Sequence, residues 1–477
     1  MLNPASEAFE TALHAALPAA AFRPLEPRYL EEPRGRYKAE DALLVAPGTV
    51  DEVARLIGLA NEMGVGVIPY GGGTGLVGGQ TMEHGPKPVL LSMERMSAIR
   101  ATYASEGVMV AEAGAILSNV HDAAEDAGRI FPLTLASQGS ARIGGLLATN
   151  AGGIGVLRYG SARDLCLGVE AVLPDGSIHH GLRRMRKDNM GYDLRHLLIG
   201  SEGTLGVITA AALRLYPKPA RQSAAFMVVP GPEAALDLLA LAQTHLGEGL
   251  SAFELIHRMG LDFLSETLPD VRQPFAEKPE WMVLIDLGVG KGADPQALLE
   301  GLFADAFEQG LASDGLIAQS EAQRAEFWAV RETIPEANRR IGAVSSHDIS
   351  MPAGAIPDFI RRAPDALARI NAYRINCFGH LGDGNLHYNV FPQPGRRKED
   401  HVNERGAVKR TIHDLVHELG GSVSAEHGIG RLKVEDLARY GDPAKLAAMR
   451  AIKQALDPRG IMNPGAVVPP ATAVAAQ

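Results

Sequence analysis

The sequence predicts an α+β protein of two or three domains. The chain has 477 residues, and at roughly 150 residues per domain this allows two or three cores of ordinary size. Up to Leu215, short apolar runs typical of strands alternate with glycine-rich turns. A proline-containing break at 216–221 follows, and beyond it Ala/Leu-rich helical stretches alternate with strands such as Trp281–Leu287.

The first part of the chain is expected to fold as strand, helix and strand. An apolar run at 42–46 ends at a proline, and Thr49 then supplies the side-chain oxygen typical of a helix N-cap. From Val53 to Ala60, apolar residues recur at helical spacing. The next strand, Val65–Pro69, leads into a cluster of glycines, so the cluster sits at the end of a strand.

Composition narrows the classes of function. Hydrophobic residues make up 46% and charged residues 21% of the chain, as in ordinary globular proteins. A net charge of −10 argues against binding to nucleic acid or to an anionic membrane surface. Cys166 and Cys377 stand far apart, which favours a reducing compartment over a disulfide scaffold. The start lacks a signal-peptide pattern and no apolar run approaches the roughly 20 residues of a membrane span, so a cytoplasmic location is expected, with peripheral contact at an inner membrane left open.

The glycine cluster at 71–79 allows two interpretations. It contains Gly73-x-Gly75-x-x-Gly78, the spacing of a Rossmann dinucleotide fingerprint. That fold requires a helix that opens within the glycines and crosses to the next strand. The connection at 79–88 is short and interrupted by a glycine and two prolines, so it cannot hold such a helix. The cluster is therefore interpreted as a pyrophosphate-binding loop of another flavin fold, because glycines let backbone N–H groups approach a phosphate.

With this loop the sequence resembles the FAD-linked oxidases of the vanillyl-alcohol-oxidase type. The similarity is greatest to the branch of D-2-hydroxyglutarate dehydrogenase, D-lactate dehydrogenase and the glycolate oxidase flavoprotein subunit. Three further segments, at 132–145, 149–160 and 200–208, carry the resemblance in the family's order. It implies a PCMH-type FAD-binding domain with two α/β subdomains over 1–219. An α+β substrate or cap domain with an antiparallel sheet would follow over 220–419 and carry the metal-site histidines, and a small helical segment over 420–477 would return to the flavin domain.

The resemblance also implies how FAD is bound. The glycine cluster would hold the pyrophosphate, and the later segments would line the flavin, the ribityl chain and the adenine. The cofactor-binding residues implied in this way are Pro69, Gly71, Gly72, Gly73, Thr74, Gly75, Gly78, Gly79, Pro132, Ser137, Gly139, Ser140, Gly144, Gly145, Asn150, Gly152, Gly153, Gly203, Ile208 and Asn463. Relatives with covalent FAD often have a histidine just after the loop's last glycines. Here Leu76 follows Gly75, so FAD is expected to be non-covalent.

A second motif brings histidines together. His380 and His387 flank Gly-Asp-Gly-Asn, which is typical of a tight turn between two strands. Taken alone, the motif fits a plain hairpin about as well as a site, although the turn lets the two side chains converge. Glu426 and His427 stand side by side before two glycines. Two histidines and a glutamate match a catalytic metal site with three protein ligands and an open position.

By resemblance, the metal ligands are His380, His387 and Glu426. The hydroxyglutarate branch binds zinc at these positions, and ligand type alone leaves manganese or iron open. Asn389, two residues after His387 and thus on the same strand face, would contact the substrate together with His427. His427 is the candidate general base, because an imidazole titrates near neutral pH.

Arg331 is the expected anchor for the substrate carboxylate. On a charged helix an arginine is by default a surface ion-pair residue, but this position matches the family's carboxylate-binding arginine. The hydroxyglutarate enzymes add a threonine and a lysine, which here are replaced by Pro335 and Ser346. Losing the lysine weakens the case for a second substrate carboxylate, unless His347 or the pair Arg339 and Arg340 substitutes for it.

The expected function is FAD-dependent, metal-assisted oxidation of a D-2-hydroxy acid to the 2-oxo acid by hydride transfer to flavin. D-2-hydroxyglutarate is the first choice of substrate, with D-lactate dehydrogenase or a glycolate oxidase flavoprotein subunit as alternatives. A metal hydrolase without flavin and a non-catalytic subunit of a larger oxidase also stay open. The chain has no iron–sulfur cysteine cluster, so an electron-transfer flavoprotein or a quinone is expected to accept the electrons. A homodimer is expected as the working form.

Overall fold

The computed structural model describes residues 2–469, so the end of the expected C-terminal segment, 470–477, lies outside the described residues. The chain divides into two compact units. The first consists of Met1–Gly153, Gly160–Lys218 and Glu426–Gln477, and the second of Ile154–Tyr159 and Pro219–Ala425. The chain divides between Lys218 and Pro219 and between Ala425 and Glu426, whereas the expected boundaries follow 219 and 419. The assignment of the short segment Ile154–Tyr159 to the second unit was not foreseen.

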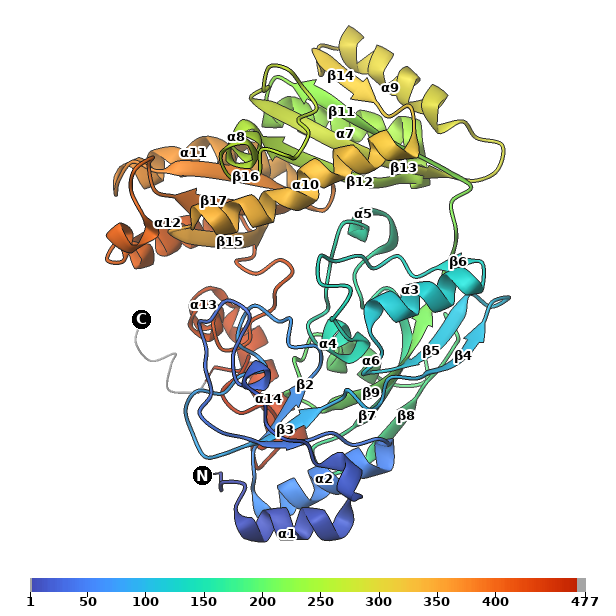
Figure 1. Ribbon diagram of the computed structural model, residues 1–477, viewed down its shortest axis with the longest axis vertical. Coiled ribbons are helices and arrows are strands. Elements are labelled where there is room, and N and C mark those ends of the chain that lie inside the picture. The colour runs from blue at the N-terminus through green and yellow to red at the C-terminus, as the bar shows by residue number, and fades with distance from the viewer. Residues whose placement is uncertain (1, 470–477) are drawn as a thin grey trace. The chain divides into compact units, whose positions relative to one another are not determined.

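The first unit contains three sheets and the helices around them (Figure 1). Its strands are β1 (Leu43–Val45), β2 (Val67–Tyr70), β3 (Val89–Ser92), β4 (Ile99–Tyr103), β5 (Val108–Glu112), β6 (Arg129–Ile130), β7 (Cys166–Val172), β8 (Ile178–Gly181), β9 (Val207–Arg214) and β10 (Tyr216–Pro217). Its helices are α1 (Glu7–Ala16), α2 (Val50–Met63), α3 (Leu117–Asp126), α4 (Ile143–Ala148), α6 (Leu194–Leu198), α13 (Val434–Tyr440) and α14 (Pro443–Leu456), with short 3₁₀ turns η1 (Ala19–Ala21) and η2 (Pro27–Tyr29).

The first small sheet presents the glycine cluster. Its three parallel strands are ordered β1-β3-β2, and α2 packs on it with an apolar face that runs from Val53 to Ala60. Helix α2 begins at Thr49, whose hydroxyl accepts the Glu52 N–H, and ends at Gly64 in the left-handed conformation. Strand β2 ends at Tyr70, and residues 71–88 contain no helix before β3 begins. The rejection of a Rossmann crossover is confirmed, since the prolines break the connection as expected.

The second sheet of the first unit has five antiparallel strands in the order β4-β5-β9-β7-β8. Strand β9 is central, and its residues are buried except at the Arg214 end. A near-continuous apolar run is expected of a strand covered on both faces. The C-terminal segment returns beside the other sheet: the Val67 N–H donates to the Ile461 carbonyl, and the Asn463 N–H donates to the Val67 carbonyl. Asn463 therefore lies in the first unit, next to the strand that precedes the glycine cluster.

The second unit is built on one seven-stranded antiparallel sheet in the order β14-β11-β13-β12-β16-β17-β15 (Figure 1). Its strands are β11 (Arg221–Val229), β12 (Leu250–His257), β13 (Trp281–Val289), β14 (Asp314–Ile317), β15 (Ser345–Ser350), β16 (Arg374–His380) and β17 (Asn385–Phe391). Its helices are α5 (Val156–Tyr159), α7 (Pro232–Leu246), α8 (Arg258–Thr267), α9 (Pro295–Glu308), α10 (Glu321–Ile341), α11 (Ile356–Ala368) and α12 (Arg405–Glu418), with 3₁₀ turns η3 (Gly247–Gly249), η4 (Ala353–Ala355), η5 (Leu381–Asp383) and η6 (Lys398–His401).

The prediction of an α+β fold with an antiparallel sheet in the second half of the chain is confirmed. One face of this sheet packs against α8 and α10 through a core that includes Phe226, Phe327 and Phe378. The other face carries Tyr388, which packs on Phe359 of α11. Side chains alternate between the two faces along each strand, so the face of every residue in this sheet follows from its register.

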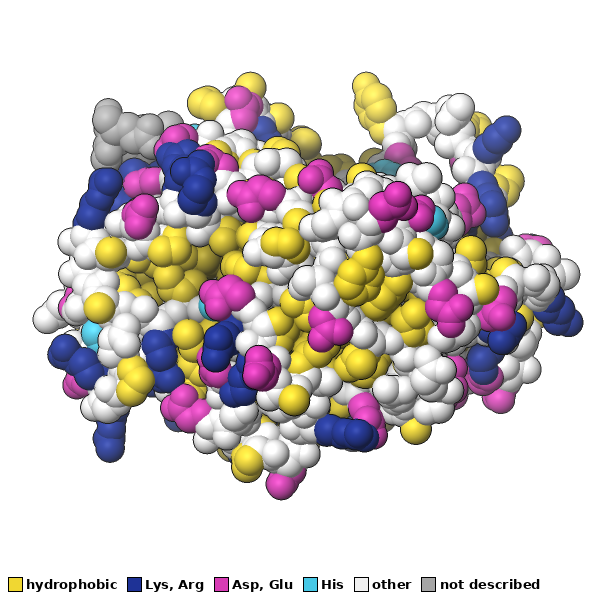
Figure 2. Space-filling model, turned by 90° about the horizontal axis from the view of Figure 1, so that it is seen from above, with side chains coloured by type: hydrophobic (Ala, Val, Ile, Leu, Met, Phe, Trp, Pro, Cys, Tyr) yellow, Lys and Arg dark blue, Asp and Glu magenta, His cyan; other side chains and the backbone are white. Residues whose placement is uncertain are grey.

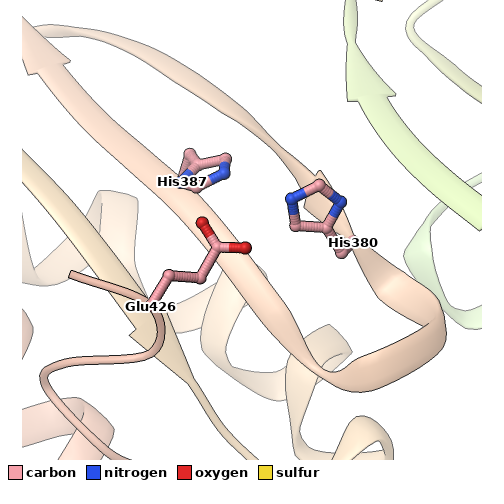
Figure 3. Close-up of side chains that lie close together, drawn as sticks. All are labelled: His380, His387 and Glu426. Atoms are coloured by element: carbon pink, nitrogen blue, oxygen red, sulfur yellow. The ribbon is translucent and has the colours of Figure 1, made fainter. Parts of the chain in front are cut away.

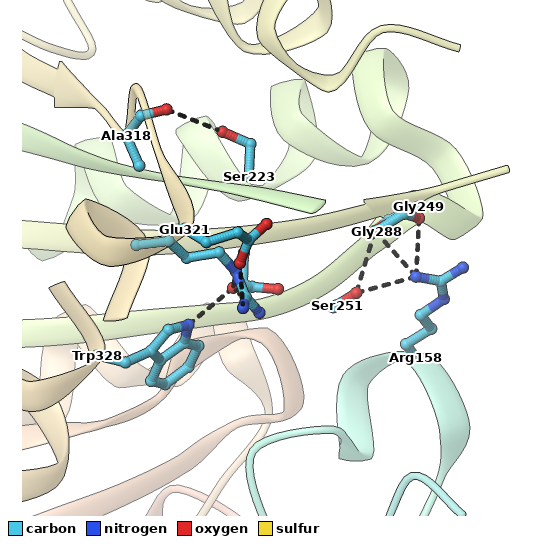
Figure 4. A network of polar contacts seen from close by, with 10 residues as sticks. Arg158, Ser223, Gly249, Ser251, Gly288, Ala318, Glu321 and Trp328 are labelled. Atoms are coloured by element: carbon cyan, nitrogen blue, oxygen red, sulfur yellow. Dashed lines mark hydrogen bonds and ion pairs between the residues drawn. The ribbon is translucent and has the colours of Figure 1, made fainter. Parts of the chain in front are cut away.

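Helix α10 is tied to the sheet by polar contacts as well as by its apolar face. Arg324 Nε donates to the buried carboxylate of Asp286 on β13 at 2.9 Å, and Trp328 Nε1 donates to the same oxygen at 2.7 Å (Figure 4). Burial raises the pKa of Asp286, and the charge of Arg324 opposes that rise. Figure 4 also shows how α5 contacts the sheet: Arg158 donates to the Gly249 and Gly288 carbonyls and to the Ser251 hydroxyl. Ile154–Tyr159 is held to the second unit in this way.

Charges of both signs are interspersed on the face of the molecule drawn in Figure 2, with hydrophobic surface between them. Between residues 2 and 469, the helices are too short or too polar to cross a membrane.

Candidate active site

The hairpin of β16 and β17 positions the two predicted histidines. His380 is the last residue of β16, η5 forms the turn, and β17 begins at Asn385. Gly384 closes the turn in the left-handed conformation, where a side chain would collide with the Met351 carbonyl. The rings of His380 and His387 lie edge to face with centroids 5.5 Å apart. The turn chemistry therefore does bring the two imidazoles together.

A buried carboxylate on the neighbouring strand holds His380. Glu254 of β12 is directly opposite His380 in the register, and its Oε1 lies 2.6 Å from His380 Nδ1. Its other oxygen accepts the Nε–H of Arg331 at 2.7 Å. Burial alone would raise the pKa of Glu254, but its contacts with His380 and Arg331 outweigh burial and hold that pKa at about 2. Glu254 thus stays ionised between the His380 ring and the Arg331 guanidinium.

His387 also faces a carboxylate across the sheet. Asp348 of β15 is its register partner, with Asp348 Oδ1 3.9 Å from His387 Nδ1. Asp348 is buried and accepts an N–H from the Asn385 amide at 3.0 Å. Asn389 lies two residues beyond His387 on the same face of β17 and is also buried. His380, His387 and Asn389 therefore share one face of the sheet.

The third predicted ligand is carried by a loop anchored to the same sheet. Ser422 pairs with Ser350 at the end of β15, and the Ala425 N–H donates to the Asp348 carbonyl. Glu426 is the next residue along the chain. Its carboxylate points toward the two imidazoles (Figure 3). One ligand atom from each of His380, His387 and Glu426 lies within 4.8 Å of the others.

This donor set fits a divalent cation. Two imidazole nitrogens and one carboxylate oxygen are the protein ligands of many catalytic zinc sites, in which the fourth position is open. Zinc binds such atoms at about 2.0–2.2 Å, so modest side-chain rotations would bring the three atoms around one ion. His427, the predicted base, follows Glu426 directly in the chain and is half-buried.

Arg331 lies in the interior, not on the surface that an isolated helical arginine would prefer. It projects from α10, is 5% exposed, and its guanidinium lies over the Phe378 ring at 4.7 Å. The Glu254 carboxylate connects Arg331 to His380, because one of its oxygens contacts each side chain. With its Nε bonded to Glu254, the edge formed by its two terminal nitrogens is one that can bind a carboxylate in bidentate fashion.

The substitutes considered for the missing lysine are placed elsewhere. Arg339 and Arg340 pair with Glu336 along α10 and are half-exposed or more. His347 lies on the opposite face of β15 from Asp348 and packs against His413 of α12. Ser346 is opposite Asn389 on the histidine face, as the motif match requires. None of these three basic side chains supplies a cation where the family has its lysine.

The predicted cofactor residues of the first unit come together from separate segments. A Cβ on Gly72 would lie 2.1 Å from the Ser140 carbonyl, and the nearest neighbour of Gly71 is the backbone of Gly145. Gly203 packs on Pro69 in the same way. The cluster, the α4 segment and the loop before β9 are thus in contact. Other predicted residues lie along these segments: Gly73, Thr74, Gly75, Gly78 and Gly79 in the cluster, Pro132, Ser137, Gly139 and Gly144 before and within α4, Gly152 and Gly153 after it, and Ile208 on β9.

These glycines fall into two groups. Gly72, Gly144 and Gly153 are required by the chain itself, because a Cβ there would collide with backbone or a neighbouring Cβ at 2.7 Å or less. Gly139 has no atom within 4 Å of its would-be Cβ, and Gly145 has only Gly71 at 4.0 Å. Open space on a glycine-lined surface fits a cofactor that approaches the backbone closely. Asn150 also holds the following loop, because its side-chain oxygen accepts from Ser161 and from the Arg163 N–H.

Arg431 joins the C-terminal segment to the glycine cluster. It donates to the carbonyls of Gly78, Gly79 and Pro464 and to the side-chain oxygen of Asn463. Asn463 in turn donates to the Gly79 carbonyl at 3.0 Å. Burial lowers the pKa of Arg431 to about 10, so the side chain is still charged at neutral pH. The returning segment therefore fixes the end of the loop expected to bind pyrophosphate.

Sequence reasoning missed Arg431, Glu254 and Asp348. For the two acids a signal was present: each is a lone carboxylate within a strand of buried residues. An ionised group in such a strand needs a partner, because burying an unpaired charge is costly. The partners themselves lie on other strands and could not be identified from the sequence.

Comparisons with known proteins agree with this architecture. Residues 218–467 match the family of FAD linked oxidases, C-terminal domain, and residues 42–181 match an FAD binding domain. The mitochondrial D-2-hydroxyglutarate dehydrogenase of Bos taurus is 38% identical over 93% of this chain and 80% of the relative. The D-2-hydroxyglutarate dehydrogenase of Xanthomonas citri pv. viticola is 36% identical over 90% of both chains.

Solved structures share the fold at low identity. Alkyldihydroxyacetonephosphate synthase superposes with a TM-score of 0.72 at 19% identity, covering 97% of this chain and 85% of that one. p-Cresol methylhydroxylase gives a TM-score of 0.72 at 14% identity, covering 98% of both chains. At these identities the likeness establishes the PCMH-type fold alone.

The expected cytoplasmic location is wrong by the same comparisons. The relatives from Arabidopsis thaliana, Bos taurus and Rattus norvegicus are mitochondrial enzymes. The two cysteines, both free and buried, fit any reducing compartment and so could not separate the cytoplasm from a mitochondrion.

A matching family description covers more than half of the chain, and the relatives match it over nine-tenths of its length. The chain belongs to the FAD-linked oxidase family and is an FAD-dependent D-2-hydroxy-acid dehydrogenase.

Proposed function

We propose that this dehydrogenase oxidises D-2-hydroxyglutarate to 2-oxoglutarate with non-covalent FAD and one divalent cation, with zinc as the first choice. The observation that carries the metal is the convergence of His380, His387 and Glu426. The choice of substrate is supported by relatives at 36–38% identity that are named for it. A non-flavin hydrolase would not account for the FAD-binding match.

The chain's own residues would bind and orient the hydroxy acid. Arg331 would hold the C1 carboxylate through its two terminal nitrogens, while Glu254 fixes its Nε. Asn389 would donate an amide N–H to the substrate from the histidine face of β17. A ring nitrogen of His427 would accept the proton of the 2-hydroxyl.

The bound groups would supply the remaining chemistry. A divalent cation at the His/Glu site lowers the pKa of a hydroxyl that it contacts. FAD supplies the hydride acceptor. The glycine cluster, the α4 segment and Asn463 would hold that FAD. Position 76, where relatives with covalent FAD often have a histidine, is a leucine, so the FAD would be non-covalent. The sequence has no cysteine cluster typical of an iron–sulfur site, so a separate electron-transfer flavoprotein or quinone would accept the electrons. The homodimer remains a prediction.

D-Lactate is the second candidate substrate, and one observation favours it. The position of the family's lysine is Ser346, and His347, Arg339 and Arg340 face elsewhere. A second carboxylate would lack the charge-assisted hydrogen bond that a lysine at this position would donate, a contact of about 1.5–3 kcal/mol. A one-carboxylate substrate loses nothing by this change.

Anaerobic flavin bleaching with a panel of acids tests the proposal. The panel contains D- and L-2-hydroxyglutarate, D- and L-lactate, glycolate and malate. D-2-hydroxyglutarate is expected to bleach the flavin band faster than D-lactate, as the names of the relatives at 36–38% identity suggest. Faster bleaching by D-lactate would establish the second candidate, and no bleaching by any D-acid would remove both.

Replacing the proposed base separates proton transfer from metal binding. His427→Ala is expected to lower kcat by about 10²–10⁴-fold, the usual contribution of a general base, with FAD and metal content unchanged. Turnover and metal analysis of the same preparation check this. His180→Ala, in an exposed histidine on β8, is the control and should behave as wild type. Full turnover by His427→Ala would exclude it as the base.

A single methyl group in the glycine cluster tests the FAD loop. Gly72→Ala would force the loop away from the Ser140 carbonyl. It is expected to weaken FAD binding by about tenfold, because overpacking typically costs about 1–3 kcal/mol of free energy and each 1.4 kcal/mol is a factor of ten in affinity. Titration of the apoprotein with FAD measures this. Gly58→Ala, on α2 where the added Cβ meets nothing within 4 Å, should bind FAD normally. Equal affinities in both variants would show that the cluster does not hold the cofactor.

A further inference from the structure

Two buried carboxylates lie behind the two histidines of the metal site, one for each. Glu254 of β12 is the register partner of His380, and Asp348 of β15 is the register partner of His387. The hairpin is thus flanked on both sides by a strand that carries an acid at the matching position. Both acids are 5% exposed or less. Burying two carboxylates in the same region is costly in free energy unless each one has a partner that binds it.

The partners of these acids are the Nδ1 atoms of the two rings. Glu254 Oε1 lies 2.6 Å from His380 Nδ1, a short hydrogen bond. Asp348 Oδ1 lies 3.9 Å from His387 Nδ1, within ion-pair distance. An ionised carboxylate can only accept, so His380 Nδ1, which is hydrogen-bonded to Glu254, must carry the hydrogen. The opposite nitrogen of that ring, Nε2, then carries no hydrogen, which is the form that binds a metal. At 3.9 Å Asp348 is too far from His387 for a hydrogen bond, so it acts on that ring through its negative charge, which favours a hydrogen on the facing Nδ1.

We propose that Glu254 and Asp348 are positioning residues of the metal centre: the Glu254 hydrogen bond sets His380 in the tautomer that presents Nε2 to the cation, and the charge of Asp348 facing Nδ1 of His387 favours the same tautomer there. The inference rests on the proposed metal-assisted function and deepens it. Nothing in the ligand motif identifies either acid, since Glu254 is 126 residues before His380 in the chain. The antiparallel register alone brings each acid to its histidine.

Glu254 has a second task that Asp348 does not share. Its other oxygen holds Arg331, the proposed anchor of the substrate carboxylate. Asp348 accepts instead from Asn385, which closes the hairpin turn. Loss of Glu254 should therefore disturb metal binding and substrate binding together, whereas loss of Asp348 should disturb metal binding alone.

The test measures zinc affinity directly, by competition with a chromophoric chelator on FAD-loaded protein. Glu254→Gln and Asp348→Asn keep the size of each side chain and remove the charge. Each is expected to bind Zn²⁺ about 10–100-fold more weakly than wild type, the usual effect of losing such a partner. Cobalt-substituted protein should show altered visible absorption in both variants, and only Glu254→Gln should also raise KM.

Asp286→Asn is the matched control. Asp286 is a buried carboxylate on the same face of the same sheet, bound to an arginine of α10, but it has no histidine partner. It should lose stability as the other variants do while keeping wild-type zinc affinity. Weaker zinc binding in this control would mean that general loosening of the sheet explains the effect, and would overturn the proposal.

A second variant covers a failure to fold. Glu254→Asp keeps the charge that Arg331 needs and withdraws the carboxylate from His380 by about one C–C bond, roughly 1.5 Å. It should fold and still lose zinc affinity. If wild type binds zinc and the carboxylate variants bind it within twofold of wild type, the positioning role is wrong and the proposed function stands. If wild type itself binds no divalent cation, both are wrong.

Discussion

The antiparallel register of the seven-stranded sheet decides where the chemistry of the second unit can take place. It puts Glu254 opposite His380 and Asp348 opposite His387, so four side chains from four strands meet on one face. A slip of one residue in either flanking strand would turn its acid to the opposite face. The site is therefore as well defined as the strand pairing, and the pairing is fixed by the apolar core on both faces of the sheet.

Buried charge ties this sheet to helix α10. Arg324 and Arg331, seven residues apart, each bind a carboxylate that is almost fully buried, Asp286 and Glu254. Removing one member of such a pair leaves the other charged and unsolvated, at a cost of about 3–5 kcal/mol. The arrangement holds α10 in one position on the sheet. Because Arg331 is also the proposed substrate anchor, structural and binding roles coincide in one residue.

The sequence was informative where chemistry is local. The Gly-Asp-Gly-Asn turn predicted that His380 and His387 converge, and the prolines between Gly79 and Val89 excluded a Rossmann crossover. Long-range register was not readable, so Glu254, Asp348 and the contact of Arg431 with the glycine cluster were found only in the structure. The compartment was wrongly predicted because composition reports redox state and not location.

The central claim is that flavin reduction by the hydroxy acid depends on a cation held by His380, His387 and Glu426. Single-turnover reduction of chelator-treated, FAD-replete enzyme tests it most directly. The account predicts a reduction rate with D-2-hydroxyglutarate or D-lactate more than about 100-fold below that of the untreated enzyme, since a cation contributes several kcal/mol, and recovery on adding one equivalent of Zn²⁺. Reduction at the full rate by metal-free enzyme would contradict it.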